Sequence, residues 1–328
     1  TEASLALARK LKSRTLEQPP LGNLGSAFAA LGAYGKALET YEQSLALARQ
    51  VGDRIGEHNA LGNIGYVYLA LNNPAKGIRY TQEKLKITRE IGDRLGESAA
   101  LNNLGIGFND AGDYTNALAA YQQALTLARR IGSRQSEEIT LGNLGLTADN
   151  LGDYDRAVAY QEQRLALSRT LQNRQGEAQA LLNLANVYAA RRQYDRAISA
   201  YQQSLTLTRQ LRTRLDEGIV LSNLGVSFLE TNNLPAAEQH LRQSIEVWES
   251  LRGGLGSNDA NKVSLFEFQA RTYRRLQQVL VAQGQFQAAL EIAERGRSRA
   301  FVDLLATRLA EKRQTRSVAP VALTQVGL

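Results

Sequence analysis

The chain of 328 residues is 43% hydrophobic and 22% charged, a balance that argues against a disordered chain or a membrane protein. It has no Cys and two His, which excludes disulfides, zinc–thiolate sites and thiol nucleophiles and restricts imidazole chemistry to His58 and His240. The net charge of +7 could attract nucleic acid or an acidic partner, but most Lys and Arg recur in step with Glu or Asp, which indicates a distributed, solvated surface.

Neither export nor membrane insertion is indicated. No stretch approaches the roughly 20 uninterrupted apolar residues of a membrane-spanning helix, and the first residues lack the order of a secretion signal. We therefore expect a soluble, cytoplasmic chain.

The first residues match the second half of a repeating unit. Residues 1–9 (TEASLALAR) align with residues 41–49 (YEQSLALAR), which we assign below to the second helix of a unit. We expect residues 1–14 to be the remnant of such a helix. Because the sequence also lacks an initiator Met, we expect a piece of a longer or processed protein.

Self-alignment at an offset of 40 residues reveals six copies of one pattern. A Leu is followed two positions later by Asn and three positions later by Leu or Ile, beginning at Leu21, Leu61, Leu101, Leu141, Leu181 and Leu221. Small residues recur in phase with it, at the Gly25 position and at the Ala37 position. A period between 20 and 50 residues is typical of stacked supersecondary units.

Each unit reads as a helix, a turn and a second helix. Apolar residues keep helical spacing on both sides of Gly112-Asp113-Tyr114: Leu101, Leu104 and Phe108 before it, and Ala117, Leu118, Tyr121, Leu125 and Ala128 after it. Short carboxylates suit helix N-caps, so Asp113 and Asp153 are expected to cap second helices, and Asp53 and Asp93 to cap first helices. The small residues let the two helices approach closely.

The combination Leu-x-Asn-Leu-Gly, then Phe or Tyr, then Gly-Asp-Tyr-x-x-Ala resembles the tetratricopeptide repeat (TPR) in a longer, 40-residue form. The resemblance covers most of the chain. It implies an all-α TPR-like solenoid, a right-handed superhelix of antiparallel helix pairs, with six repeats over residues 15–251.

After Leu251 the pattern shifts. The segment Gly284-Gln285-Phe286-x-x-Ala289 corresponds to Gly112-Asp113-Tyr114-x-x-Ala117, an offset of 172 residues, or four periods of 40 plus 12. Loop-forming residues gather between the two patterns. We expect an insertion loop over residues 252–262, an atypical capping hairpin and junction helix over residues 263–311, and a linker or tail over residues 312–328.

Residues 293–305 (AERGRSRAFVDLL) resemble the junction helix of bacterial proteins that carry TPRs before a caspase-like CHAT domain. That domain holds a Cys–His pair, so it is absent from this Cys-free sequence. The resemblance implies a regulatory or recruiting arm for a downstream enzyme. An amphipathic capping helix is an equally good interpretation of the segment.

The candidate binding site is the asparagine of each repeat. In the TPR family the first helix lines the concave surface, and the position before Leu-Gly points into the groove. The corresponding residues, which we call the asparagine row, are Asn23, Asn63, Asn103, Asn143, Asn183 and Asn223. An amide offers both donors and an acceptor, so the row could satisfy the main chain of a bound peptide. The alternative is that each Asn bonds a neighbouring helix and fixes repeat stacking.

Polar residues one turn away favour the groove interpretation over a face meant only for the core. They are Tyr66, Asn109, Asp110, Asp149, Asn150 and Asn186. The acidic members Asp110 and Asp149, with Glu230, suggest a partner that carries a basic side chain, although helical surfaces carry such charges routinely.

The leading hypothesis is a protein- or peptide-binding scaffold that is not an enzyme and needs no cofactor or metal. His58 and His240 occupy different repeat positions, so neither indicates a metal site. Nucleic-acid binding is the alternative, suggested by the basic residues Arg295, Arg297, Arg299, Arg308, Lys312, Arg313 and Arg316. The recurring Arg–Glu pairs at i,i+3, from Arg54–Glu57 to Arg214–Glu217, are expected to be exposed pairs of little energy.

Overall fold

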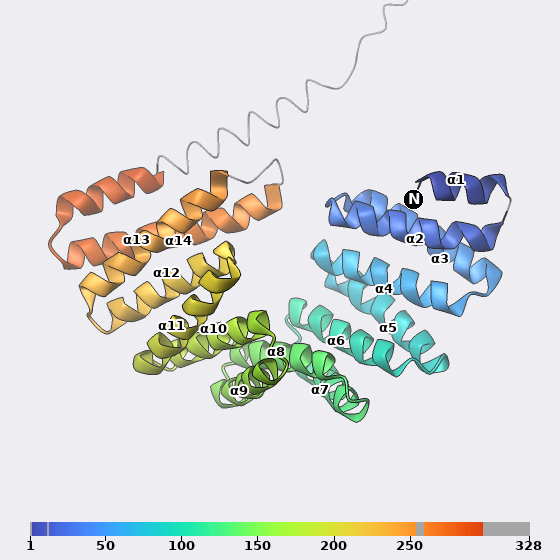
Figure 1. Ribbon diagram of the computed structural model, residues 1–328, viewed down its shortest axis with the longest axis horizontal. Helices are drawn as coiled ribbons and strands as arrows, with labels where there is room; N and C mark the ends of the chain where they lie inside the picture. The colour runs from blue at the N-terminus through green and yellow to red at the C-terminus, as the bar shows by residue number, and fades with distance from the viewer. Residues whose placement is uncertain (1, 12, 254–258, 298–328) are drawn as a thin grey trace, which may run out of the picture. The chain divides into compact units, whose positions relative to one another are not determined.

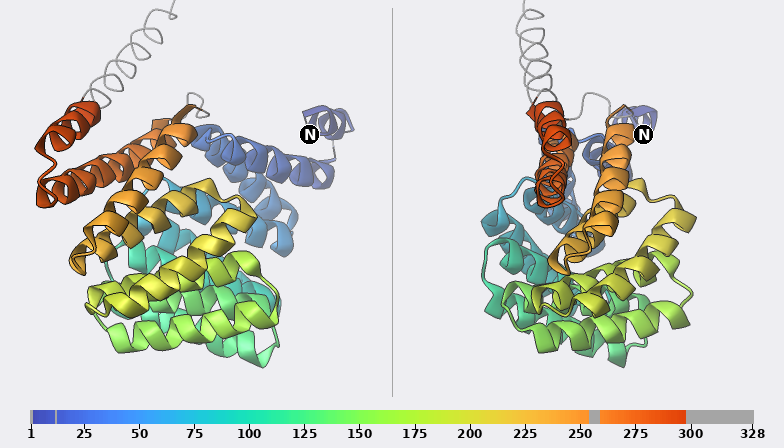
Figure 2. Two further views of the ribbon diagram at one scale, coloured as in Figure 1. Left: turned by 60° about the vertical axis from the view of Figure 1, so that its left-hand side comes forward. Right: turned by 90° about the vertical axis from the view of Figure 1, so that its left-hand side faces the viewer.

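The computed structural model describes residues 2–11, 13–253 and 259–297, and its secondary structure is helical throughout these ranges (Figures 1 and 2). Two compact units, Thr1–Val187 and Tyr188–Leu328, divide the chain within one helix. The all-α class expected from the repeat is therefore confirmed.

In the first unit the helices follow one another as antiparallel pairs. Their bounds are α1 (Glu2–Lys10), α2 (Arg14–Ala30), α3 (Tyr34–Val51), α4 (Arg54–Ala70), α5 (Pro74–Glu90), α6 (Arg94–Asp110), α7 (Tyr114–Arg130), α8 (Arg134–Asn150), α9 (Tyr154–Thr170) and α10 (Arg174–Ala190), the last of which crosses the unit boundary. Each helix from α1 to α8 packs against the next, and first helices also contact one another in the series α2, α4, α6, α8. Contacts between sequential neighbours build a solenoid.

The second unit continues the pattern and then departs from it. Its helices are α11 (Tyr194–Leu211), α12 (Arg214–Glu230), α13 (Leu234–Gly253) and α14 (Asp259–Ala282), followed by helical residues 286–297. The helices α13 and α14 include residues 252–253 and 259–262 of the segment expected as an insertion loop, while residues 254–258 lie outside the described residues. Of the junction helix, only residues 293–297 are described.

The turns explain why the helices begin where they do. The carboxylates of Asp53, Asp93, Asp113 and Asp153 each accept a backbone N–H three residues ahead, at 2.8 to 3.2 Å, which confirms the four predicted caps. In the turn before α7, Gly112 has a φ of 76°, a left-handed conformation that costs a residue without Cβ little. The repeat therefore specifies both the turn and the cap.

The small residues allow close packing within each pair, as the sequence predicts. A Cβ added at Gly105 would lie 2.4 Å from Cε1 of Tyr121, and Ala117 is completely buried. Leu101 and Leu104 join the core between α6 and its neighbours. Removing the Cβ at one position thus makes room for a large ring from the paired helix.

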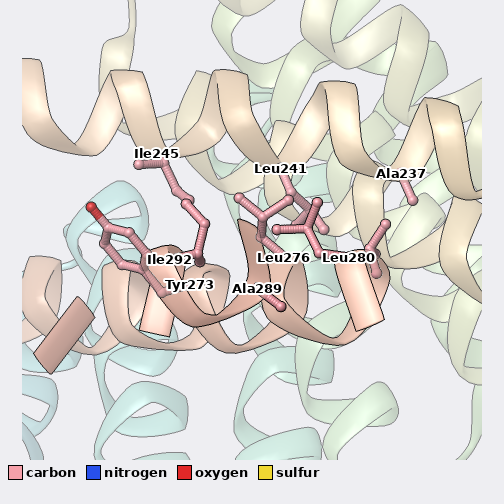
Figure 3. Packing of buried hydrophobic residues seen from close by; sticks show 9 residues of the cluster. Ala237, Leu241, Ile245, Tyr273, Leu276, Leu280, Ala289 and Ile292 are labelled. Atoms are coloured by element: carbon pink, nitrogen blue, oxygen red, sulfur yellow. The ribbon is translucent and has the colours of Figure 1, made fainter. Parts of the chain in front are cut away.

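A separate core holds the end of the second unit together (Figure 3). It brings residues of α13 (Ala237, Leu241 and Ile245) onto residues of α14 (Tyr273, Leu276, Val279 and Leu280) and onto Ala289 and Ile292 of the last helical segment. The Trp248 side chain is also fully buried, in space that the absence of a Cβ at Gly218 leaves open.

A buried glutamate in the first turn of α4, α6, α8, α10 and α12 binds two arginines. The Glu97 side chain is only 9% exposed; its Oε1 accepts from Arg89 Nε at 2.7 Å and its Oε2 accepts from Arg94 Nη1 at 2.8 Å. The same arrangement recurs at Glu57, Glu137, Glu177 and Glu217. The expectation of exposed pairs is wrong for the carboxylate, because the preceding second helix covers it and supplies the other arginine.

Candidate functional site

The asparagine row lies on first helices, between residues of the core. Leu101 and Leu104 are buried on either side of Asn103, so the intervening amide is directed away from the densest packing. Asn23 is exposed, and the other five asparagines are partly buried. Five members belong to the first unit, where the first helices adjoin, and Asn223 belongs to α12 of the second.

The amides of the row do not share one role. Asn143 Nδ2 donates to Asn102 Oδ1 at 2.9 Å, which ties α8 to α6. Within the described residues, the side chains of Asn23, Asn63, Asn103 and Asn183 make no hydrogen bond. Asn223 has an interaction partner. Asn143 thus follows the stacking interpretation, while these four amides keep their donors and acceptors available.

A depression between α2 and α4 brings two members of the row together. It has a volume of about 430 Å³, and its lining includes Asn23, Asn59 and Asn63. Amide groups from two helices therefore face one accessible space. That arrangement suits the hydrogen-bonding groups of a bound main chain.

Among the flanking residues, Tyr66 is 61% exposed on α4 and Asn186 is partly buried with a partner. Asn109 Oδ1 accepts from Thr147 Oγ1 at 3.1 Å, another bond between α6 and α8. Asn150 is exposed at the end of α8. Of these residues, Tyr66 and Asn150 are the more accessible to a partner.

Of the two carboxylates on this face, Asp110 is exposed and Asp149 is partly buried. Burial raises the pKa of Asp149 above its ordinary value, and burial also raises the pKa of Asp110, against a smaller opposing effect of its hydrogen bond with Asn109. A cation from a partner would favour the charged form of either group. In the second unit, Glu230 Oε2 accepts from Tyr194 Oη at 3.4 Å.

Sequence reasoning missed exposed apolar side chains on α8. Ile139 and Leu146 are 49% and 44% exposed, four residues before and three residues after Asn143. Their helical spacing places them on the same face as Asn143, so the surface is mixed and not purely polar. The spacing alone could have revealed both residues.

Two cations on second helices were also missed. A Cβ added at Gly62 would lie 3.0 Å from Lys84 Nζ, and one added at Gly142 would lie 3.0 Å from Nη1 of Arg164. Both side chains are partly buried. The signal in the sequence is a glycine followed 22 positions later by a long cation, in the second and fourth repeats only.

The two histidines make different local contacts. His58 is buried with Nδ1 2.8 Å from Thr88 Oγ1, and its pKa is lowered chiefly by burial. His240 Nδ1 lies 2.7 Å from the carbonyl of Ala236. No group of His, Asp and Glu suited to a metal ion occurs in the part of the chain that the structure describes.

Among the described helices, none combines the length and the apolar character needed to cross a bilayer.

The family model for the tetratricopeptide repeat matches residues 17–90, 56–130, 96–170 and 176–250. Human tetratricopeptide repeat protein 28 is 36% identical over 96 residues, and the mouse protein of that name is 35% identical over 96 residues. Each alignment covers 29% of this chain and only 4% of the relative.

Solved structures share the fold at low sequence identity. A signal transduction ATPase with a tetratricopeptide repeat sensor from Pyrococcus horikoshii has a TM-score of 0.71 and 17% identity, over 89% of this chain and 43% of that one. A Rap protein complexed with competence and sporulation factor has a TM-score of 0.56 and 20% identity, over 84% and 77% of the two chains. With the family match over more than half of its residues, the chain belongs to the tetratricopeptide repeat family.

Proposed function

We propose that the chain is a binding scaffold that holds a peptide segment of a partner protein on the first-helix surface of its first unit. We define this surface by the outward residues of α2, α4, α6, α8 and α10, including Asn63, Asn103 and Asn183. The observation that carries the proposal is the set of accessible amides without internal partners. Among the similar folds, one belongs to a protein complexed with a factor and another to a sensor, and both roles involve binding.

The division of roles along the surface follows from the contacts. Amides without partners bind the main chain of the segment, while Tyr66 and the carboxylates of Asp110 and Asp149 select its side chains. Each hydrogen bond contributes about 0.5 to 1.5 kcal/mol net, so the loss of a single amide should lower the affinity a few-fold. Several amides acting together give useful affinity without demanding one sequence.

A second candidate role is that of a regulatory arm for a caspase-like domain elsewhere in a longer protein. It rests on the resemblance of residues 293–305, of which residues 298–305 lie outside the described residues. Direct binding of this chain to a purified caspase-like domain would support it, and absence of binding would exclude it for that domain.

The described part of the basic cluster disfavours the nucleic-acid alternative. Arg295 Nη2 is 2.6 Å from Glu249 Oε2, and Arg297 Nη2 is 2.6 Å from Glu294 Oε1. Both cations are thus paired within the protein. Arg299, Arg308, Lys312, Arg313 and Arg316 lie outside the described residues.

The test compares variants at asparagines without a hydrogen-bond partner with a variant at Asn143, which has one. Peptides selected by the wild-type chain from a displayed random library are titrated against a triple variant with Ala at Asn63, Asn103 and Asn183. We expect at least a tenfold loss of affinity with unchanged thermal stability. The control Gln122→Ala, an exposed amide on α7, should change neither quantity.

The stacking interpretation gives the opposite pattern. Asn143→Ala removes the bond to Asn102 and should lower stability before it affects binding. If the triple variant melts early, or if it stays folded and binds the peptides as tightly as the wild type, the row does not form the recognition surface.

A further inference from the structure

Two cationic side chains reach the first-helix surface from the second helices behind it. Lys84 on α5 approaches Gly62 of α4, and Arg164 on α9 approaches Gly142 of α8. Both lie in the first unit, two repeats apart in the same repeat position. The corresponding position holds Ser44 in the first repeat, so a long cation is not required for packing.

Neither cation is neutralised by a direct partner. Lys84 makes no side-chain hydrogen bond or ion pair with any described residue. Arg164 Nη2 donates to Gln179 Oε1 at 2.9 Å, but Arg164 Nε is buried without an acceptor. Burial lowers the pKa of both groups, which reflects the cost of holding a partly desolvated cation.

The nearest carboxylates have other partners. Asp93 caps α6 by accepting from the backbone N–H of Gly96 at 2.8 Å. Glu138 is buried, and its oxygens accept from Ser168 and from Asn173 at 2.8 to 2.9 Å. Asp93 attracts Lys84, and Glu138 attracts Arg164, through electrostatic interaction without a direct ion pair. Capacity for a further anion therefore remains at both positions.

An exposed apolar side chain accompanies each cation. Tyr66 follows Gly62 by four residues, and Leu146 follows Gly142 by four residues, so each lies one helical turn away on the same face. The second and fourth repeats thus present the same combination of a cation and an apolar neighbour. Two equivalent positions on one surface suit a repeated motif in the partner.

We propose that Lys84 and Arg164 bind two acidic side chains of the partner peptide, each beside an apolar residue. This inference rests on the proposed function and specifies its partner as an acidic peptide segment. The planar guanidinium of Arg164 can hold a carboxylate through two N–H groups, whereas Lys84 acts as a point charge.

The repeat geometry gives the spacing of the two acidic residues. Neighbouring helices pack with their axes about 8 to 10 Å apart, and α4, α6 and α8 are successive neighbours. The two positions are therefore separated by roughly 16 to 20 Å. An extended peptide advances about 3.3 Å per residue, so the acidic residues should be roughly five or six residues apart.

A peptide fits this surface better than a nucleic acid does. A phosphate backbone presents closely spaced anions. Each strand of a duplex carries about one negative charge per 3.4 Å along the helix axis. The first-helix surface offers two isolated cations and also carries Asp110 and Asp149, which would repel a continuous polyanion. Two well-separated carboxylates match the two cations and present fewer negative charges for Asp110 and Asp149 to repel.

The experiment uses defined probes. A fluorescein-labelled 12-residue peptide of Ser and Asn carries two Leu-Glu pairs whose Glu residues are six positions apart, and matched peptides carry Gln or Lys instead. A 12-nucleotide single-stranded DNA is the fourth probe. We expect the Glu peptide to bind at least tenfold more tightly than the Gln peptide and the DNA, and its affinity to fall with added salt.

Variants assign the effect to the two cations. Lys84→Met and Arg164→Met should each lower the affinity for the Glu peptide about tenfold and leave the affinity for the Gln peptide unchanged. The controls Lys86→Met and Arg130→Met remove exposed cations elsewhere on α5 and α7 and should have no effect. If Lys84→Met unfolds, Gly62→Ala serves as the second variant. It keeps the charge of Lys84 but displaces its flexible ammonium group, and it should also lower the affinity for the Glu peptide.

The outcomes separate this inference from the proposed function. Equal binding of the Glu and Gln peptides, abolished by the triple asparagine variant, would overturn the acidic preference and leave the scaffold intact. No binding of any of the peptides would overturn the inference, while library selection tests the scaffold independently. Tighter binding of the DNA, lost in Lys84→Met, would replace the peptide with a nucleic acid.

Discussion

Replacing Glu97 with Gln should destabilise the repeats around α6 far more than removing an exposed charge. The substitution keeps the shape of the side chain but replaces one carboxylate oxygen by an NH₂ group. Because Glu97 is 9% exposed and binds two arginines, the new donor would face Arg89 or Arg94 where an acceptor is needed. One arginine bond is lost, and the other is weakened because its acceptor no longer carries a charge.

The expected magnitude follows from the exposure of the partners. Hydrogen bonds to charged groups contribute about 1.5 to 3 kcal/mol each when protected from water. The arginine side chains are 51% and 64% exposed, so solvent screens both interactions. We therefore take about 1 kcal/mol for each bond and expect a loss of about 1 to 2 kcal/mol in the free energy of unfolding, since one bond is lost and the other is weakened.

Urea unfolding followed by circular dichroism measures this loss, with Glu42→Gln as the control. Glu42 is exposed on α3, so the control removes the same charge without removing a buried acceptor. Amide hydrogen exchange should show reduced protection mainly in α5, α6 and their neighbours, because each repeat depends on adjacent repeats. Equal stability of the two variants, within about 0.5 kcal/mol, would refute the assigned role of Glu97.

The dependence on pH provides an independent check. The hydrogen bond from Arg89 is the largest cause that lowers the pKa of Glu97 below its ordinary value of 4.5. A carboxyl group with a lowered pKa in the folded state stabilises the fold fully above its unfolded pKa and loses that contribution as pH falls through the folded pKa. The stability difference between wild type and Glu97→Gln should therefore be constant near neutral pH and shrink in acid.

Two further substitutions test the local packing and capping. Asp93→Ala removes the oxygen that caps α6 and should cost about 1 kcal/mol in urea unfolding, with no loss if the cap is unimportant. Gly105→Ala should lower the melting temperature because the added Cβ would lie 2.4 Å from the Tyr121 ring. Gly22→Ala, where nothing lies within 4 Å, should instead raise the melting temperature through better helix propensity. The same direction of change at both glycines would contradict this account.

Much of the local structure follows from the sequence because its causes act over a few residues. The Asp113 carboxylate accepts the backbone N–H of Asn116, three residues later, and Gly112 supplies the left-handed turn before it. Leu101 and Leu104 follow the helical period that places them in one core. Repetition at 40 residues makes these short-range signals unambiguous.

The candidate site could be located by position but not interpreted by sequence alone. Six identical asparagines suggest one role, yet the structure pairs Asn143 with Asn102 and gives Asn103 no side-chain partner among the described residues. Residue 102 is Gly, Ser or Leu in other repeats, so the partner depends on which hairpins adjoin. The binding role of the row stays a prediction.

Only the tertiary structure decided the positions of the long charged side chains. Glu97 is buried because Arg89 reaches it from the preceding helix, and Lys84 approaches α4 because Gly62 leaves room for it. Such side chains can extend to solvent or to a neighbour. Which of the two conformations a side chain adopts depends on the groups that the stacking of hairpins brings close to it. The local sequence does not specify those groups.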